Sequence, residues 1–164
     1  MRKMILGVIL TTFVAAIPVD AFSAETIVTC KNPAGHANYH YAGILQEKDK
    51  GFVEDKVTGG ITTLIKIKEN EYDILFVDTR EKIISTKSDG GRVVLLRKGK
   101  NDATFLLMHP GMVITLYTFY RESDGRERFD MLSSKGGDGM PIHKSSVMTG
   151  NCSGLNLKLL HSSG

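Results

Sequence analysis

The segment from Ser133 to Ser146 concentrates most of the side chains in this chain that could do chemistry. The segment contains three glycines within four consecutive positions. Glycine lets backbone amides approach an anion or a substrate closely. A carboxylate, an imidazole, an ammonium group and a hydroxyl accompany them. We expect the segment to take part in ligand binding through Gly137, Asp138, His143, Lys144 and Ser145.

The same segment matches neither a nucleotide-binding nor a calcium-binding motif. The spacing of a phosphate-binding loop is absent, and one glycine-aspartate cluster is not the repeat that binds calcium. The sequence therefore predicts no cofactor and does not identify the ligand. A structural alternative stays open, in which the segment is a long connection between strands and Asp138 caps its turn.

A hydrolytic site can be composed from these residues as well. Ser145 would be the nucleophile, His143 the general base and Asp138 the carboxylate that orients the imidazole. Positions 143 and 145 share one face of a strand, but this spacing does not establish a contact between them. The chain also lacks the Gly-x-Ser-x-Gly turn that presents the serine of many hydrolases. We therefore predict no catalytic residues and keep a small secreted hydrolase as an alternative.

The histidines do not predict a metal site. His36 and His40 lie four positions apart, in a stretch typical of a loop that enters a strand. On a strand this spacing separates them by about 13 Å, which is too far to share one ion. A zinc site would need His109 or His143 brought in by the fold.

Two cysteines, Cys30 and Cys152, stand near opposite ends of the chain. An even cysteine count in an oxidising compartment predicts a disulfide. Their bridge would close a loop of more than a hundred residues. The chain-entropy model gives about 4 to 5 kcal/mol for such a loop as an upper figure. We expect this disulfide to hold the two ends of the fold together.

The first residues have the order of a secretion signal. Arg2 and Lys3 are basic, residues 4–17 are apolar apart from two threonines, and a stretch rich in small residues follows at 21–24. The apolar run is shorter than the about 18 to 20 residues that span a bilayer. We predict a signal peptide over residues 1–23, cleaved after Ser23 or after Ala21. The mature protein would be periplasmic or secreted, without a transmembrane segment.

Residues 24–164 are predicted to form a single β-rich domain. Roughly 140 residues suffice to bury one core without a metal. The composition, 41% hydrophobic and 24% charged, is that of an ordinary globular domain. The formal net charge of +3 falls to +2 without the leader, which is too little to favour a nucleic-acid partner. The oligomeric state is not predicted.

The hydrophobic pattern has the period of β-strands. Apolar side chains alternate over residues 61–67 and 72–76 around a turn at 69–71, which predicts a hairpin. Glycine-rich or proline-containing turns then recur about every ten residues. The further expected strands are 82–86, 92–97, 103–108, 112–120, 126–133, 142–148 and 155–160. Residues 39–45 could form another strand, whereas the charged stretch 46–56 is typical of a loop or one helical turn.

Connections this short favour an antiparallel meander. Two of the expected strands, 93–96 and 105–108, are apolar on both faces, which favours cover on both sides. The sequence therefore predicts an all-β fold of about eight to nine strands in a small barrel or a two-sheet sandwich. The side chains expected in its core include Ile65, Phe76, Leu95, Phe105 and Ile114.

These features favour an exported, non-enzymatic β domain that binds an unknown small molecule or envelope protein. Besides the hydrolase, a third possibility is an inhibitor or structural adaptor of another exported protein. Such an adaptor would use an exposed strand edge or the glycine-rich segment.

Overall fold

The structure is a computed structural model that describes residues 23–42, 50–77 and 81–160. The predicted signal peptide lies outside the described residues apart from Ser23. Residues 43–49, which contain the end of the possible strand 39–45 and the start of the charged stretch 46–56, also lie outside them. Among the residues described, no helix is long and apolar enough to cross a membrane.

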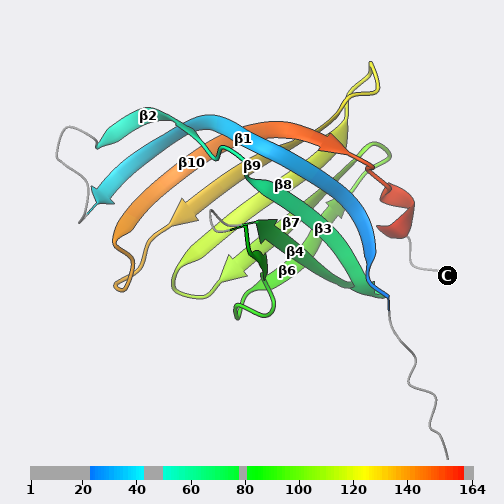
Figure 1. Ribbon diagram of the computed structural model, residues 1–164, viewed down its shortest axis with the longest axis horizontal. Coiled ribbons are helices and arrows are strands. Elements are labelled where there is room, and N and C mark those ends of the chain that lie inside the picture. Colours follow the sequence, from blue (N-terminus) through cyan, green and yellow to red (C-terminus); the bar gives the residue numbers. More distant parts are fainter. Residues whose placement is uncertain (1–22, 43–49, 78–80, 161–164) are drawn as a thin grey trace, which may run out of the picture.

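The fold is all-β and antiparallel, which confirms the predicted class (Figure 1). The described residues form ten strands, which are β1 (Glu25–Ala42), β2 (Gly51–Lys56), β3 (Ile61–Lys68), β4 (Glu71–Val77), β5 (Ile83–Ser85), β6 (Arg92–Lys98), β7 (Asp102–His109), β8 (Val113–Arg121), β9 (Glu127–Lys135) and β10 (Ile142–Ser153). They form one sheet in the order β5-β4-β3-β1-β10-β9-β8-β7-β6, and β2 pairs with β1 outside this path.

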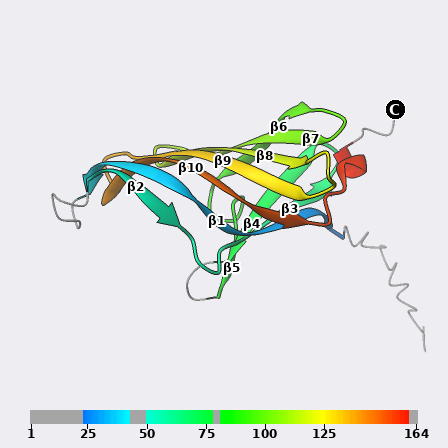
Figure 2. The same cartoon turned by 90° about the horizontal axis from the view of Figure 1, so that it is seen from above.

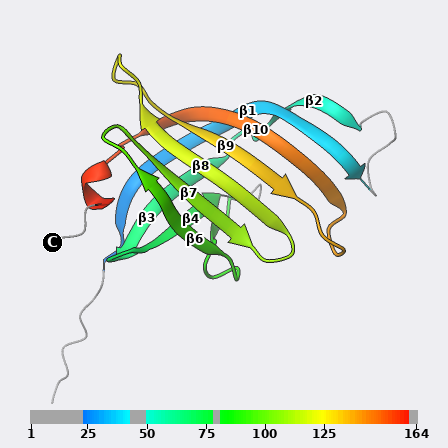
Figure 3. The same cartoon turned by 180° about the vertical axis from the view of Figure 1, so that it is seen from behind.

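The sheet consists of two meanders joined by β1. Strands β3 to β5 form one meander and β6 to β10 the other. The first part of β1 pairs with β3, its second part pairs with β2, and its other edge pairs with β10 along most of its length. The sheet curls into a half-barrel, in which β3 and β4 lie across from β6 and β7 (Figures 2 and 3). Strands β4 and β6 contact each other although they do not pair.

An aromatic cluster fills the inner face of the half-barrel. Phe105, Phe119 and Phe129 are fully buried, and neighbouring rings in this set lie about 6 Å apart, at 6.2 and 6.1 Å between centroids. Gly150 pairs with Phe129 on the neighbouring strand, and a Cβ at position 150 would collide with the Phe129 ring. The glycine therefore makes room for the ring, and the interior is packed with side chains.

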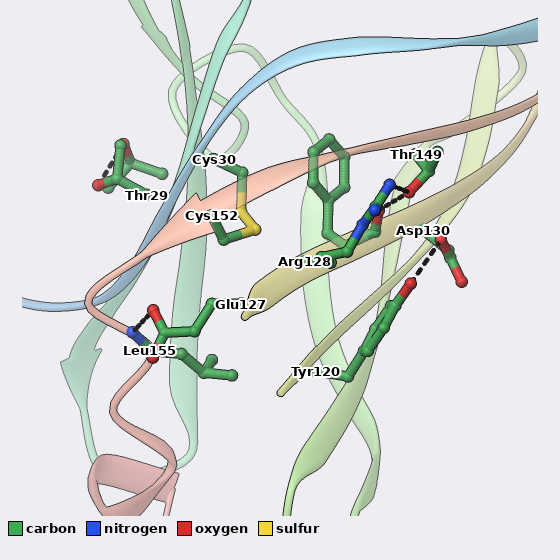
Figure 4. The surroundings of a disulfide bond; sticks show 11 residues. Thr29, Cys30, Tyr120, Glu127, Arg128, Asp130, Thr149, Cys152 and Leu155 are labelled. Atoms are coloured by element: carbon green, nitrogen blue, oxygen red, sulfur yellow. Dashed lines mark hydrogen bonds between the residues drawn. A yellow bond between two sulfur atoms is a disulfide. The ribbon is translucent and has the colours of Figure 1, made fainter. Parts of the chain in front are cut away.

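The disulfide between Cys30 and Cys152 is confirmed (Figure 4). The two cysteines face each other in the register of β1 and β10 although they are 122 positions apart in the sequence. The bridge therefore fixes the pairing of the first long strand with the last.

Three of the five side chains expected in the core lie there. Phe105 is fully buried, and Phe76 and Leu95 are partly buried against the core. The expectation for Ile65 was wrong, because the buried positions of β3 are 62 and 64 and position 65 lies on the opposite face, where it is partly buried. Ile114 is 55% exposed, which contradicts its expected burial. In β8 the buried positions are 115, 117 and 119, so position 114 faces outward.

The expectation of cover on both sides was likewise wrong for residues 93–96. Val94 and Leu96 are 41% and 53% exposed. The outward face of this edge strand is exposed to solvent, and it carries apolar side chains where edge strands commonly carry charged ones.

Two further elements differ from the sequence-based expectations. The charged stretch 46–56 contains β2 rather than a loop or helical turn, and in this strand the exposed positions 52, 54 and 56 alternate with the half-buried positions 51, 53 and 55. The expected strand 155–160 is wrong, since residues Leu157–Leu160 form a 3-10 turn after Gly154, which has a positive φ of 75°. Leucines at every second position gave this segment the pattern of a strand.

The C-terminal turn closes one end of the half-barrel. Leu155 and Leu160 are buried in the core. The Leu155 amide donates a hydrogen bond to Glu127 Oε2 at 2.9 Å (Figure 4). The Leu155 carbonyl accepts a hydrogen bond from Arg121 Nη2 at 2.9 Å. Glu127 and Arg121 also form an ion pair at 2.7 Å, so one charged pair holds both polar groups of the Leu155 backbone.

Truncation of Phe105 and Ile114 should separate the two faces of the sheet. Phe105→Ala should lower the free energy of unfolding by about 3 to 5 kcal/mol because it leaves a cavity in the core. Ile114→Ala should change it by no more than about 0.5 kcal/mol because the side chain faces outward. Chemical denaturation of both variants measures the difference, and equal losses would place Ile114 in the core.

Acid should weaken the attachment of the C-terminal turn through Glu127. Partial burial raises the pKa of this carboxyl, but hydrogen bonds from Leu155 and Arg121 outweigh it and hold the pKa below its usual value. The carboxylate therefore stabilises the fold above its usual pKa of about 4.3 and loses this contribution as the pH falls through the folded-state pKa.

Glu127→Gln should accordingly melt at a lower temperature than the unmodified protein at pH 7. The difference should close as the pH falls below about 4. Glu122→Gln, which changes an ion pair with Arg126 in the nearby turn, is the control. A difference for Glu127→Gln that stays constant with pH would contradict this assignment.

Candidate binding groove on the outer face

The glycine-rich connection between β9 and β10 packs against the turn between β7 and β8. The Gly136 amide donates a hydrogen bond to the Met112 carbonyl at 2.9 Å. Gly137 has a positive φ of 110°, and a Cβ there would collide with the carbonyl oxygen of Gly111. Glycine is therefore required at 137 by the close approach of two turns. The His143 imidazole, whose Nε2 lies 3.1 Å from the Gly137 carbonyl, also contacts this connection.

The five predicted ligand-binding residues do not form one cluster. Asp138 is exposed in the connection, while Gly137 and Ser145 each line a hollow on the outer face, which we define as the face opposite the aromatic core. Lys144 alternates with Ser145 along β10 and therefore faces inward.

Lys144 belongs to a polar cluster that joins three strands. Its Nζ lies 2.5 Å from Asp55 Oδ2 on β2 and 3.3 Å from the Tyr39 hydroxyl on β1, and that hydroxyl donates to Asp55 at 3.2 Å. Burial lowers the pKa of Lys144, but the hydrogen bonds to Asp55 and Tyr39 outweigh burial and raise the pKa above its usual value. This arrangement attaches the edge strand β2 to β10 across β1.

The histidines and Ser145 occupy the outward side of the same strands. Ser145 Oγ lies 3.3 Å from His40 Nε2, so its observed side-chain partner is His40. His36 and His40 are both exposed on β1. No group of three potential metal ligands gathers anywhere in the ranges that the structure describes.

The outer face contains a groove that the sequence analysis did not identify. One hollow of about 470 Å³ crosses from β8 to β2, and its apolar lining residues are Phe52, Ile114, Leu116, Leu132 and Val147. A second hollow of about 580 Å³ lies at the β7–β8 turn. The two hollows share Ile114 and Ser134, so we treat them as one groove and call it the outer groove.

Strand register produces the shape of this groove. Ile114, Ser134, Ser145 and Asn38 lie opposite one another on β8, β9, β10 and β1, and their row ends at Phe52 on β2. The neighbouring row on the same face contains Leu116, Leu132, Val147 and His36. Small polar side chains thus form the floor, and larger apolar ones stand beside it.

Only part of the outer face is apolar. Farther along the same strands the outward positions carry Thr104, Thr118, Asp130 and Thr149, and Thr104 and Thr118 bond to each other at 3.0 Å. In the middle strands the exposed apolar side chains therefore gather at the groove, and Val94 and Leu96 add further apolar surface on the edge strand β6. The sequence signal for them was present in the strands that are apolar on both faces, where it was interpreted as a buried core.

No protein-family model, no curated protein and no solved structure matches this chain.

Loss of the Asp55 charge should release β2 from the sheet. Asp55→Asn keeps the size of the side chain but removes the ion pair with Lys144. Amide hydrogen exchange over residues 51–56 should accelerate, while exchange in β8 and β9 stays the same. Glu54→Gln, at the adjacent exposed position, should leave β2 protected. Unchanged exchange in Asp55→Asn would mean that backbone pairing alone holds the strand.

Proposed function

We propose that the protein is an exported, non-enzymatic β domain that binds an elongated apolar ligand in the outer groove. The observation that carries this proposal is the exposure of the groove's apolar side chains. Ile114, Leu132 and Val147 are 55%, 47% and 61% exposed, although they lie in the middle of the sheet. Contiguous exposed apolar surface is typical of binding sites.

The volume and lining of the groove fit a small molecule. Its hollows of about 470 and 580 Å³ lie within the range of about 300 to 1,000 Å³ that is common for ligand sites. Each methylene group of a bound ligand would contribute about 0.8 kcal/mol to the free energy of binding if the groove covered it fully. The interior of the half-barrel is filled by aromatic rings, so the argument for ligand binding depends on the outer face.

Export to the periplasm or the exterior is supported by the pattern of the leader and by the disulfide. Disulfides form and persist in oxidising compartments, and Cys30 pairs with Cys152. The hydrolase alternative has weaker support. It pairs Ser145 with His143, but Ser145 contacts the exposed His40, and His143 Nε2 lies against the Gly137 carbonyl.

Introducing a charge into the groove should abolish binding. Val147→Asp places a carboxylate on the apolar surface, and the affinity for the neutral probe N-phenylnaphthylamine, measured by fluorescence titration, should fall at least about tenfold. Asn151→Asp adds the same charge on the same strand and face, outside the groove, and should not alter the affinity. Circular dichroism checks the fold, and Ile114→Asn serves as a second groove variant.

Two results would contradict the proposal. One is binding of the probe that is equally strong in the Val147 and Ile114 variants. The other is a dimer of the unmodified protein that Val147→Asp converts to a monomer, as measured by light scattering. That second result would identify the face as an interface between copies.

A further inference from the structure

One end of the outer groove is cationic. Arg92 lines the hollow at the β7–β8 turn, together with Gly90, Met108, Gly136 and Gly137. Its side chain is exposed, and none of the ion pairs found in the described ranges includes it. An arginine of this kind presents its guanidinium donors to a ligand without first breaking a contact with the protein.

Strand register places Arg92 in line with the floor of the groove. Arg92 faces Met108, and Met108 faces Ile114, which begins the row that ends at Phe52. Four strand-to-strand steps separate Ile114 from Phe52, a span of roughly 19 Å at the usual spacing. Two further steps lead from Ile114 to the strand of Arg92. A chain anchored at Arg92 therefore reaches the strand of Val147 after four steps, again roughly 19 Å, and this span suits one extended acyl chain whose tail ends before Phe52.

Among the residues described, no charged side chain lines the opposite end of the groove. Beside it on β2, the exposed Glu54 and Lys56 lie on the same face and carry opposite charges. A negative group is therefore attracted to the Arg92 end rather than to this one.

Two acidic residues adjoin lining residues of the cationic end in sequence. Asp89 lies 3.5 Å from His109 Nε2, and Asp138 is exposed. Neither carboxylate forms an ion pair with Arg92.

The width of the groove favours one chain over two. The floor between Ile114 and Phe52 consists of the small side chains of Ser134, Ser145 and Asn38, which form a single row. Leu132 and Val147 stand along one side of this row. One row of small residues accommodates one acyl chain lying across the strands.

On the basis of the proposed groove, we propose that the ligand is a free long-chain fatty acid. Its carboxylate pairs with the guanidinium of Arg92, and its tail lies over Ile114, Leu132 and Val147 toward Phe52. A guanidinium donates two parallel hydrogen bonds to a carboxylate, which gives the bound chain one direction.

The test compares an acid with a neutral chain of the same length. Binding of palmitate and of hexadecanol to the purified protein is measured by displacement of N-phenylnaphthylamine. Palmitate should bind the unmodified protein about tenfold more tightly. Arg92→Ala should reduce its affinity to that of hexadecanol and leave the binding of hexadecanol unchanged. Arg92→Gln, a second variant, should have the same effect.

The matched control is Arg97→Ala. Arg97 lies on the same strand and pairs with Asp102 at 2.5 Å, outside the groove. Its removal lowers the net charge by the same amount and should change neither affinity. Equal weakening by both arginine variants would mean that only net charge matters, and it would overturn the proposed contact.

The outcomes separate this inference from the proposed function. If palmitate and hexadecanol bind equally to the unmodified protein, and Val147→Asp weakens both, then the groove binds apolar chains and the role of Arg92 is wrong. If neither compound binds and the probe does not bind either, both proposals fail. Binding of palmitate that is unaffected in the Arg92 variants also overturns the inference.

Discussion

The pairing of β1 with β10 is the constraint on which the rest of the structure depends. Each of the two meanders has local connections, but among the described strands only β1 is hydrogen-bonded to both meanders. The disulfide between Cys30 and Cys152 lies in this junction and fixes its register. Because a shift by one residue would turn every side chain of β10 to the opposite face, the bridge also determines which side chains face the core and which face the groove.

Curvature then divides the sheet into two chemically different faces. The inner face is packed with Phe105, Phe119 and Phe129, and the C-terminal turn covers one end of it. The outer face has no such cover in the described residues, yet it keeps a patch of apolar side chains at one end. Apolar side chains that are exposed to solvent instead of buried in the core are the strongest indication of a binding function in this molecule.

The sequence predicted the fold class, the central strands and the disulfide, because turns rich in glycine separate alternating segments of strand length. It did not predict which face is buried in strands that are apolar on both. The side chain of Ile114 is as apolar as its inward neighbours, and only the register of β8 with β9 places it outside. The edge strand β2 was missed because its charged positions resemble a loop.

The candidate site was predicted only in part for a related reason. The glycine-rich segment does border the groove through Gly137, and Ser145 lies on its floor. The other wall comes from strands whose exposed leucine, isoleucine and valine residues have the sequence pattern of a core. Lys144 was expected beside Ser145, but the alternation of a strand directs it to the opposite face, where it contacts Asp55.

The position of β1 has a consequence for the time order of folding. Among the described strands, β1 emerges first during synthesis and its partner β10 emerges last. The meander from β6 to β10 can form from local hairpins, but closure onto β1 must wait for a contact across 122 positions. Such non-local pairing is slow because the loop entropy is lost before the contact is gained. Until then β3 and β2 can pair with one edge of this eighteen-residue strand, while the edge that later receives β10 is open to pairing with a neighbouring chain.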